Sequence, residues 1–154
     1  MSNLPKTWLL WIGLALAWSL AASVGAEDET LWVIVHPSVP AAELTPDQLT
    51  AIFTLSQRVW PGGQSVIPYN YDPANSLRQR FDRLVLGMDS DEVARFWIDR
   101  KIRGQGDSPR KVPSVALMVR IVANLPGAIG YVPAGTPATG TKVVAQVPRR
   151  AGAK

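Results

Sequence analysis

Residues 124–132 read Asn-Leu-Pro-Gly-Ala-Ile-Gly-Tyr-Val and are predicted to join an apolar helix to a short buried strand. Pro126 ends the helical pattern, and Gly127 supplies backbone freedom where the helix gives way to extended chain. The run Ala128–Val132 predicts the strand, with Gly130 inside it. Because glycine weakens a strand, we expect a close neighbour at Gly130, which is either a packed helix or a ligand.

The segments before this stretch alternate between strands and helices. Thr30–His36 is β-branched and aromatic, which is typical of a buried strand. Thr45–Gln48 predicts a helix start with a hydroxyl cap, a proline at the first helical position and a glutamine that completes a capping box. Gln64–Asn70 predicts a short strand, which Pro68 places at a sheet edge or end. The nearly all-apolar run Val115–Asn124 predicts a helix central to the core.

Two more helices and a last strand are predicted. The first helix begins at Asn75 or Ser76, either of which can cap it, and continues through Leu86. The second begins with a capping box at Asp89. Lys142–Val147 predicts the last strand. The first helix should present Leu77, Phe81 and Leu84 on its apolar face and Arg78, Arg80 and Arg83 elsewhere, whereas the second should bury Val93, Phe96 and Trp97.

Residues 1–26 have the three-part pattern of a secretory signal peptide: a polar start with one lysine, an apolar run and a small-residue end. The run is shorter than the roughly 20 apolar residues that span a bilayer. Val24-Gly25-Ala26 predicts cleavage before Glu27; an uncleaved anchor held at the interface by tryptophans is the alternative. The chain has no cysteine, which excludes disulfides and a lipid anchor. We expect a protein free in the periplasm, with one domain over residues 27–148 and a basic tail over 149–154.

The charge of the predicted mature chain suits a small anion or an acidic surface. Residues 27–154 contain fifteen lysines and arginines against twelve acids, a net charge near +3. This balance is not a nucleic-acid signature, so no nucleic-acid partner is expected. Six of the basic residues lie between Arg95 and Lys111, where they form either a solvated helix face and loop or a rim that attracts anions.

Several motifs together resemble one protein family. Leu44-Thr45, Gln48-Leu49, Ile52-Phe53-Thr54 and Trp60-Pro61-Gly62-Gly63 precede the 126–132 segment in the order found in periplasmic phosphate-binding proteins, the solute receptors of phosphate ABC transporters. The resemblance extends from about Thr30 to Val132. It implies an α/β fold like that of a type II periplasmic binding protein. Because full receptors have two lobes, it further implies a reduction to essentially one lobe, with a small mixed sheet flanked by helices.

The candidate ligand site is the helix start at 72–78. The first N–H groups of a helix are unpaired and carry the positive dipole end, so they can bind an anion near a serine hydroxyl. In the resembled family an arginine and a Ser-Gly-Thr run hold phosphate at this turn, and here Asp72, Leu77 and Arg78 replace the arginine, glycine and threonine. The Asp72 carboxylate can repel a doubly charged phosphate, or it can accept a hydrogen bond from a monoprotonated oxyanion. Arg78 can compensate for the lost arginine. The candidate ligand-binding residues are Asp72, Asn75, Ser76, Leu77 and Arg78, with Ser38 and Gly130. A plain helix cap without a ligand is the alternative.

Enzyme chemistry has little support in the sequence. His36, the only histidine, stands at a strand end, where a capping or core role explains it. Without cysteines or a histidine pair there is no standard zinc site, cysteine nucleophile or haem attachment. We therefore expect a binding module that has no metal or cofactor.

Two functions are consistent with these features. The first is a solute-binding domain that recognises an oxyanion, phosphate being the family's ligand, for uptake with an ABC permease or for sensing with a membrane sensor. The second is a periplasmic interaction module that keeps the fold without a small ligand. Convergence of Ser76, Arg78 and the Gly130 segment on one concavity would favour the first function.

Overall fold

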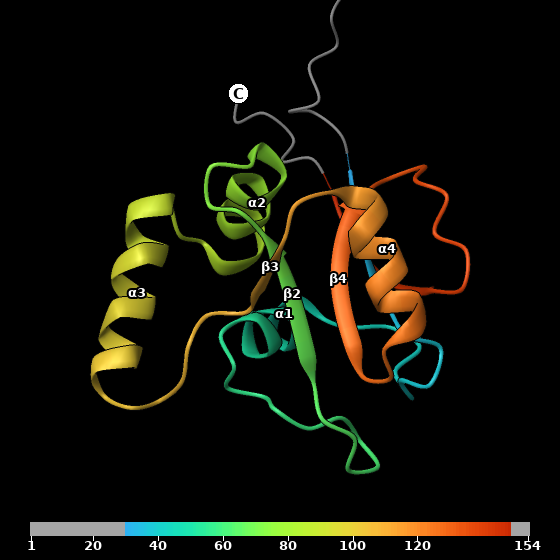
Figure 1. Ribbon diagram of the computed structural model, residues 1–154, viewed down its shortest axis with the longest axis horizontal. Helices are drawn as coiled ribbons and strands as arrows, with labels where there is room; N and C mark the ends of the chain where they lie inside the picture. Colours follow the sequence, from blue (N-terminus) through green and yellow to red (C-terminus); the bar gives the residue numbers. More distant parts are fainter. Residues whose placement is uncertain (1–29, 149–154) are drawn as a thin grey trace, which may run out of the picture.

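The computed structural model describes residues 30–148, which form a five-stranded mixed sheet with helices on both faces (Figure 1). The strand order is β3-β2-β4-β1-β5. The strands are β1 (Leu31–Val35), β2 (Ile67–Tyr71), β3 (Arg110–Val112), β4 (Ala128–Pro133) and β5 (Lys142–Val147). β2 runs parallel to β3 and β4, whereas β1 is antiparallel to β4 and β5. The predicted signal peptide and basic tail lie outside the described residues.

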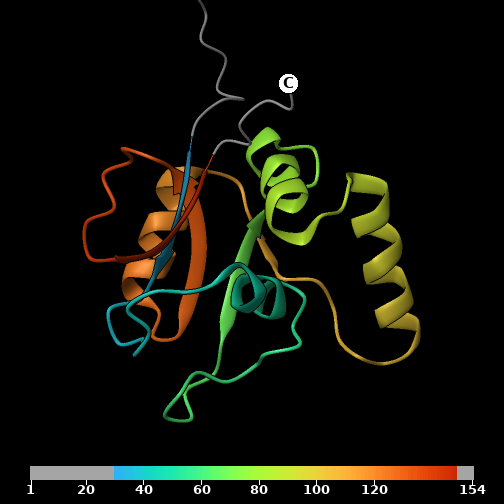
Figure 2. The same cartoon turned by 180° about the vertical axis from the view of Figure 1, so that it is seen from behind.

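The helices are α1 (Pro46–Phe53), α2 (Ser76–Phe81) with its π-helical continuation η1 (Asp82–Leu86), α3 (Ser90–Ile102) and α4 (Val115–Asn124). α4 covers one face of the sheet, and α1 lies on the other (Figures 1 and 2). α3 stands at the far end, away from the sheet (Figure 1). Within residues 30–148, no helix combines the length and apolar character needed to cross a membrane.

The predicted helix starts at Thr45 and Asp89 are confirmed. Each of these side chains accepts a hydrogen bond from a backbone N–H in the first turn, and Gln48 or Glu92 completes the capping box. Of the two candidate caps before α2, Asn75 is the one used: its Oδ1 accepts from the Leu77 N–H at 2.9 Å.

The stretch 124–132 is the structural centre, because β4 is the middle strand of the sheet. Gly127 has φ 84°, a conformation that favours glycine, and its carbonyl accepts a hydrogen bond from the Trp60 indole at 3.0 Å. From β4, Tyr131 stacks on Phe81 with centroids 3.9 Å apart and meets Phe53 edge-on at 5.9 Å. These rings hold α1 and α2 on one face of the sheet.

Of the two positions expected from Pro68, a sheet edge or an end, the edge is wrong, because β2 lies between β3 and β4, and Pro68 is the second residue of its strand. The Ile67 N–H donates to the Gly127 carbonyl on the β4 side, so the next residue turns its nitrogen toward β3. β3 pairs with β2 only from Tyr69 onward. The missing N–H of Pro68 therefore removes no ladder hydrogen bond.

The expectation that α4 is central to the core is also wrong. Only Met118 and Val122 of this helix are fully buried, whereas Leu117 and Ile121 are half-buried. α4 packs one face on the sheet, and Gly140 of the following loop lies close to Ala123 on the helix. α3 likewise buries only Val93 fully and leaves its predicted partners Phe96 and Trp97 half-buried.

Candidate functional site

The turn between β2 and α2 lies at the carboxyl ends of the parallel strands, where α/β proteins usually bind ligands. β2, β3 and β4 are parallel, so their carboxyl ends share this edge. The chain leaves β2 through α2 and α3 to reach β3 on one side, and then returns through α4 to β4 on the other side. This reversal makes the gap between β2 and β4 a topological switch point, where open α/β sheets form their ligand crevices.

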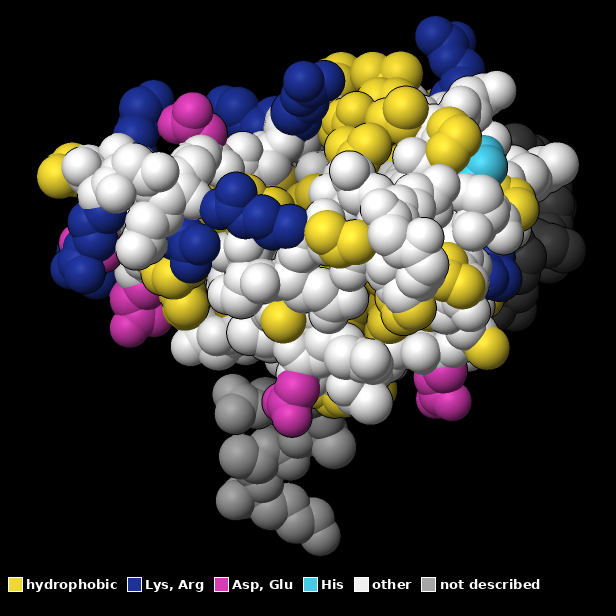
Figure 3. Space-filling view, turned by 90° about the horizontal axis from the view of Figure 1, so that it is seen from below, with side chains coloured by type: hydrophobic (Ala, Val, Ile, Leu, Met, Phe, Trp, Pro, Cys, Tyr) yellow, Lys and Arg dark blue, Asp and Glu magenta, His cyan; other side chains and the backbone are white. Residues whose placement is uncertain are grey.

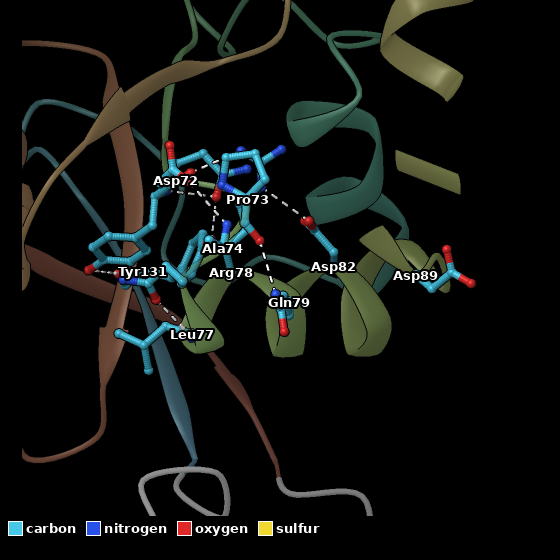
Figure 4. Close-up of polar contacts among 12 residues, drawn as sticks. Asp72, Pro73, Ala74, Leu77, Arg78, Gln79, Asp82, Asp89 and Tyr131 are labelled. Atoms are coloured by element: carbon cyan, nitrogen blue, oxygen red, sulfur yellow. Dashed lines mark hydrogen bonds and ion pairs between the residues drawn. The ribbon is translucent and has the colours of Figure 1, made fainter. Parts of the chain in front are cut away.

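The candidate residues of this turn are held by local hydrogen bonds (Figure 4). Asp72 accepts from the Ala74 N–H at 3.1 Å and from the Lys111 ammonium at 3.2 Å. The Ala74 hydrogen bond and Lys111 together hold the pKa of Asp72 below its ordinary value. Ser76 is exposed at the first helical position. The turn is thus ordered before any ligand binds.

Arg78 is buried, which corrects its placement away from the buried face of this helix. Its guanidinium Nη1 donates to the Tyr71 carbonyl at 2.9 Å, and its Nε lies 3.2 Å from Asp82 Oδ2. The sequence pattern predicted that one face of this helix is buried. In the structure α2 lies between the end of β2 and α3, so these elements cover a second face, which carries Arg78. Arg80, which was also placed away from the apolar face, is buried as well.

Asp82 is the counter-ion of Arg78 and was not predicted to have a role. Its side chain is 4% exposed, and Oδ1 has no hydrogen-bond partner among residues 30–148. Burial raises the pKa of Asp82 above its ordinary value, while the Arg78 charge acts in the opposite direction. Burying the charges of Arg78 and Asp82 costs desolvation free energy, which their direct hydrogen bond offsets in part.

A cavity of about 180 Å³ opens beside this ion pair, between α2, α3 and β3. Two cations and two hydroxyls line it: Arg78, Lys111, Ser90 and Ser108. Its remaining wall consists of Asp82 and four side chains without charge: Pro73, Val93, Ala94 and Trp97. The cations and hydroxyls are donors suited to an anion, and the apolar wall reduces competition from water.

Lys111, Ser90, Ser108 and Trp97 were not predicted to be site residues. Lys111 reaches Asp72 because β3 pairs with β2, and a three-residue strand gives no periodic signal. The only available sign was the excess of basic residues between Arg95 and Lys111. In Figure 3, Lys and Arg side chains gather on the half of the molecule that carries α3.

Ser38 is not part of this site. It follows β1, which is antiparallel to β4, so it lies at the edge opposite to the carboxyl ends of β2 and β4. There it accepts a hydrogen bond from Gln64 Nε2 at 3.0 Å and lies 2.8 Å from His36 Nδ1. The sequence alone could not show this, because it does not reveal strand direction.

Gly130 is buried in β4 beneath α4. A Cβ at this position would overlap the Met118 sulfur. Of the two interpretations, close packing of a helix therefore explains this glycine. Of Ser76, Arg78 and the Gly130 segment, only Arg78 lines the cavity beside α2, so the three do not converge on one concavity.

The fold of residues 30–148 can be compared with known proteins. No protein-family model matches the chain, and no curated protein matches it. Solved structures do match. An ABC-type phosphate transport receptor from Vibrio cholerae has a TM-score of 0.60 and 18% identity, over 75% of this chain and 45% of its own. PstS from Borrelia burgdorferi has a TM-score of 0.61 and 19% identity, over 76% and 47%.

The fold is that of a single periplasmic-binding-protein lobe. A Clostridium perfringens substrate-binding protein with bound phosphate gives the same result, with a TM-score of 0.61 and 18% identity. This confirms the predicted fold class. The chain spans less than half the length of each of these proteins.

Proposed function

We propose that this chain is a one-lobed solute-binding domain that recognises a small oxyanion, with phosphate as the first candidate. The observation that carries the proposal is the cavity beside the α2 start, where Arg78, Lys111 and two serine hydroxyls converge. The fold supports the choice of anion, because one similar structure is a phosphate transport receptor and another contains bound phosphate. Periplasmic export through the 1–26 segment, and a permease or membrane sensor as partner, belong to the same proposal.

Lys111 is the cation best placed to engage a ligand. Its ion pair with Asp72 is exposed, with 55% and 61% of the two side chains accessible, so water and salt weaken it. Lys111 can therefore leave Asp72 for an anion at little cost. Arg78 stays paired with Asp82 and contributes its positive charge to the cavity.

The test is thermal unfolding of the purified chain with increasing phosphate or sulfate against chloride at equal ionic strength. A ligand that binds only the folded state raises Tm with its concentration. We expect this rise in the parent and its loss in Lys111→Gln and Ser108→Ala, because both side chains line the cavity. Lys101→Gln is the matched control, because Lys101 is an exposed, ion-paired lysine outside the cavity. A Tm unaffected by every oxyanion would overturn the proposal.

The second candidate function is an interaction module without a small ligand. It is favoured by the carboxylates already paired with both cations, and by the exposure of Ile98 and Ile102 on α3, at 59% and 80%. This candidate predicts no anion-dependent shift. The same unfolding experiment therefore separates the two functions.

A further inference from the structure

The cavity beside Arg78 is lined by two kinds of side chain. The polar kind comprises the cations Arg78 and Lys111, the hydroxyls of Ser90 and Ser108, and Asp82, which Arg78 neutralises. The other kind is uncharged and comprises Pro73, Val93, Ala94 and Trp97. A bare oxyanion can use only the polar side chains, because it has no apolar surface to set against the others.

The size of the cavity also favours a ligand that carries an apolar group in addition to an oxyanion. Its volume is about 180 Å³. A closed apolar cavity of roughly 150 Å³ accepts a benzene ring, and this cavity, which is open to solvent, has room for a group of that size. A small ring or alkyl group therefore fits beside Trp97 and Val93, with the charged group toward Lys111.

The Trp97 ring that forms this wall is held by its neighbours. Phe96 meets it edge-on, with centroids 5.1 Å apart and an interplanar angle of 83°. The Arg100 guanidinium lies 5.9 Å from its centroid. Trp97 is thereby positioned before a ligand arrives, which lowers the entropy cost of stacking an apolar group on it.

We infer that the preferred ligand is a small organic phosphate or phosphonate. Its oxyanion contacts Lys111 and Arg78, and its apolar substituent packs on Trp97 and Val93. This inference rests on the proposed function and specifies its substrate class. Burial of the substituent against the apolar wall adds binding free energy that inorganic phosphate cannot obtain.

Titration calorimetry of the full chain with phenylphosphonate and inorganic phosphate tests the inference. We expect phenylphosphonate to bind at least tenfold more tightly. Trp97→Ala should bring the ratio of the two affinities toward one, and Ala94→Phe, which fills the cavity and keeps Trp97, should do the same. Ile98→Ala, on the exposed side of α3, is the control and should leave the ratio unchanged.

The outcomes separate the inference from the proposed function. Equal affinities for the two anions would overturn the inference and leave oxyanion binding standing. Benzyl alcohol binding as tightly as phenylphosphonate would also overturn it, because the anion would then contribute nothing. Failure of both anions to bind would overturn the proposed function itself. Circular dichroism of each variant establishes that it is folded.

Discussion

Two ion pairs border the candidate cavity, and their N···O distances are equal at 3.2 Å. Arg78 and Asp82 are 5% and 4% exposed, whereas Lys111 and Asp72 are 55% and 61% exposed. Burial raises the pKa of Asp82, while hydrogen bonds hold the pKa of Asp72 below its ordinary value. Access to solvent, and not distance, therefore decides their roles: the first pair is part of the core, and the second is available to a ligand.

The largest effect should come from Asp82→Ala. This change leaves the Arg78 guanidinium buried without its counter-ion, and such losses cost roughly 3–5 kcal/mol. Urea denaturation followed by circular dichroism measures the free energy of unfolding. A loss below about 1 kcal/mol would show that burial does not distinguish the two pairs.

Replacing both partners should be much less damaging. The double variant Arg78→Met, Asp82→Leu removes both buried charges and keeps apolar volume, which is often close to neutral. The Tyr71 carbonyl still loses its donor, so some destabilisation remains. We expect the double variant to recover at least half of the loss seen in Asp82→Ala. Equal instability of the two variants in the same urea titration would mean that the pair makes a specific contribution beyond charge compensation.

The pH dependence of stability should differ in sign between the two carboxylates. Asp82 has a raised pKa in the folded state, so its contribution is most favourable below its ordinary value of 3.8 and is lost as pH rises through the folded pKa. Asp72 has a lowered pKa, so its contribution is present above 3.8 and is lost on acidification. Urea midpoints of the parent, Asp82→Asn and Asp72→Asn across this range measure both effects. Shifts of the same sign would contradict the comparison.

The smallest effect should come from the exposed pair. Asp72→Ala and Lys111→Ala should each change the urea midpoint by no more than the scatter between repeat titrations. Any residual difference should disappear in about 1 M salt, where the screening length is about 3 Å. A salt-resistant loss comparable to that of Asp82→Ala would show that this pair, too, is structural.

The candidate site shows where sequence reasoning stops. The turn and the α2 start were predicted, and Asn75 and Ser76 were both proposed as caps, because a cap and its N–H group are only a few residues apart. The second cation was missed, because Lys111 meets Asp72 across 39 positions of the chain. Ser38 was included in error, because its distance from the site depends on β1 being antiparallel to β4.

The sequence alone determined the local features of this protein: two capping boxes, the end of α4 just before Pro126, and strands at 31–35 and 128–133. Each depends on backbone preferences and hydrogen bonds within a few residues. The tertiary structure decided the rest: the interior position of β2, the pairing of β3 and the burial of Arg78. These depend on which segments pack together, and burial there outweighs the polar character that would otherwise place an arginine in water.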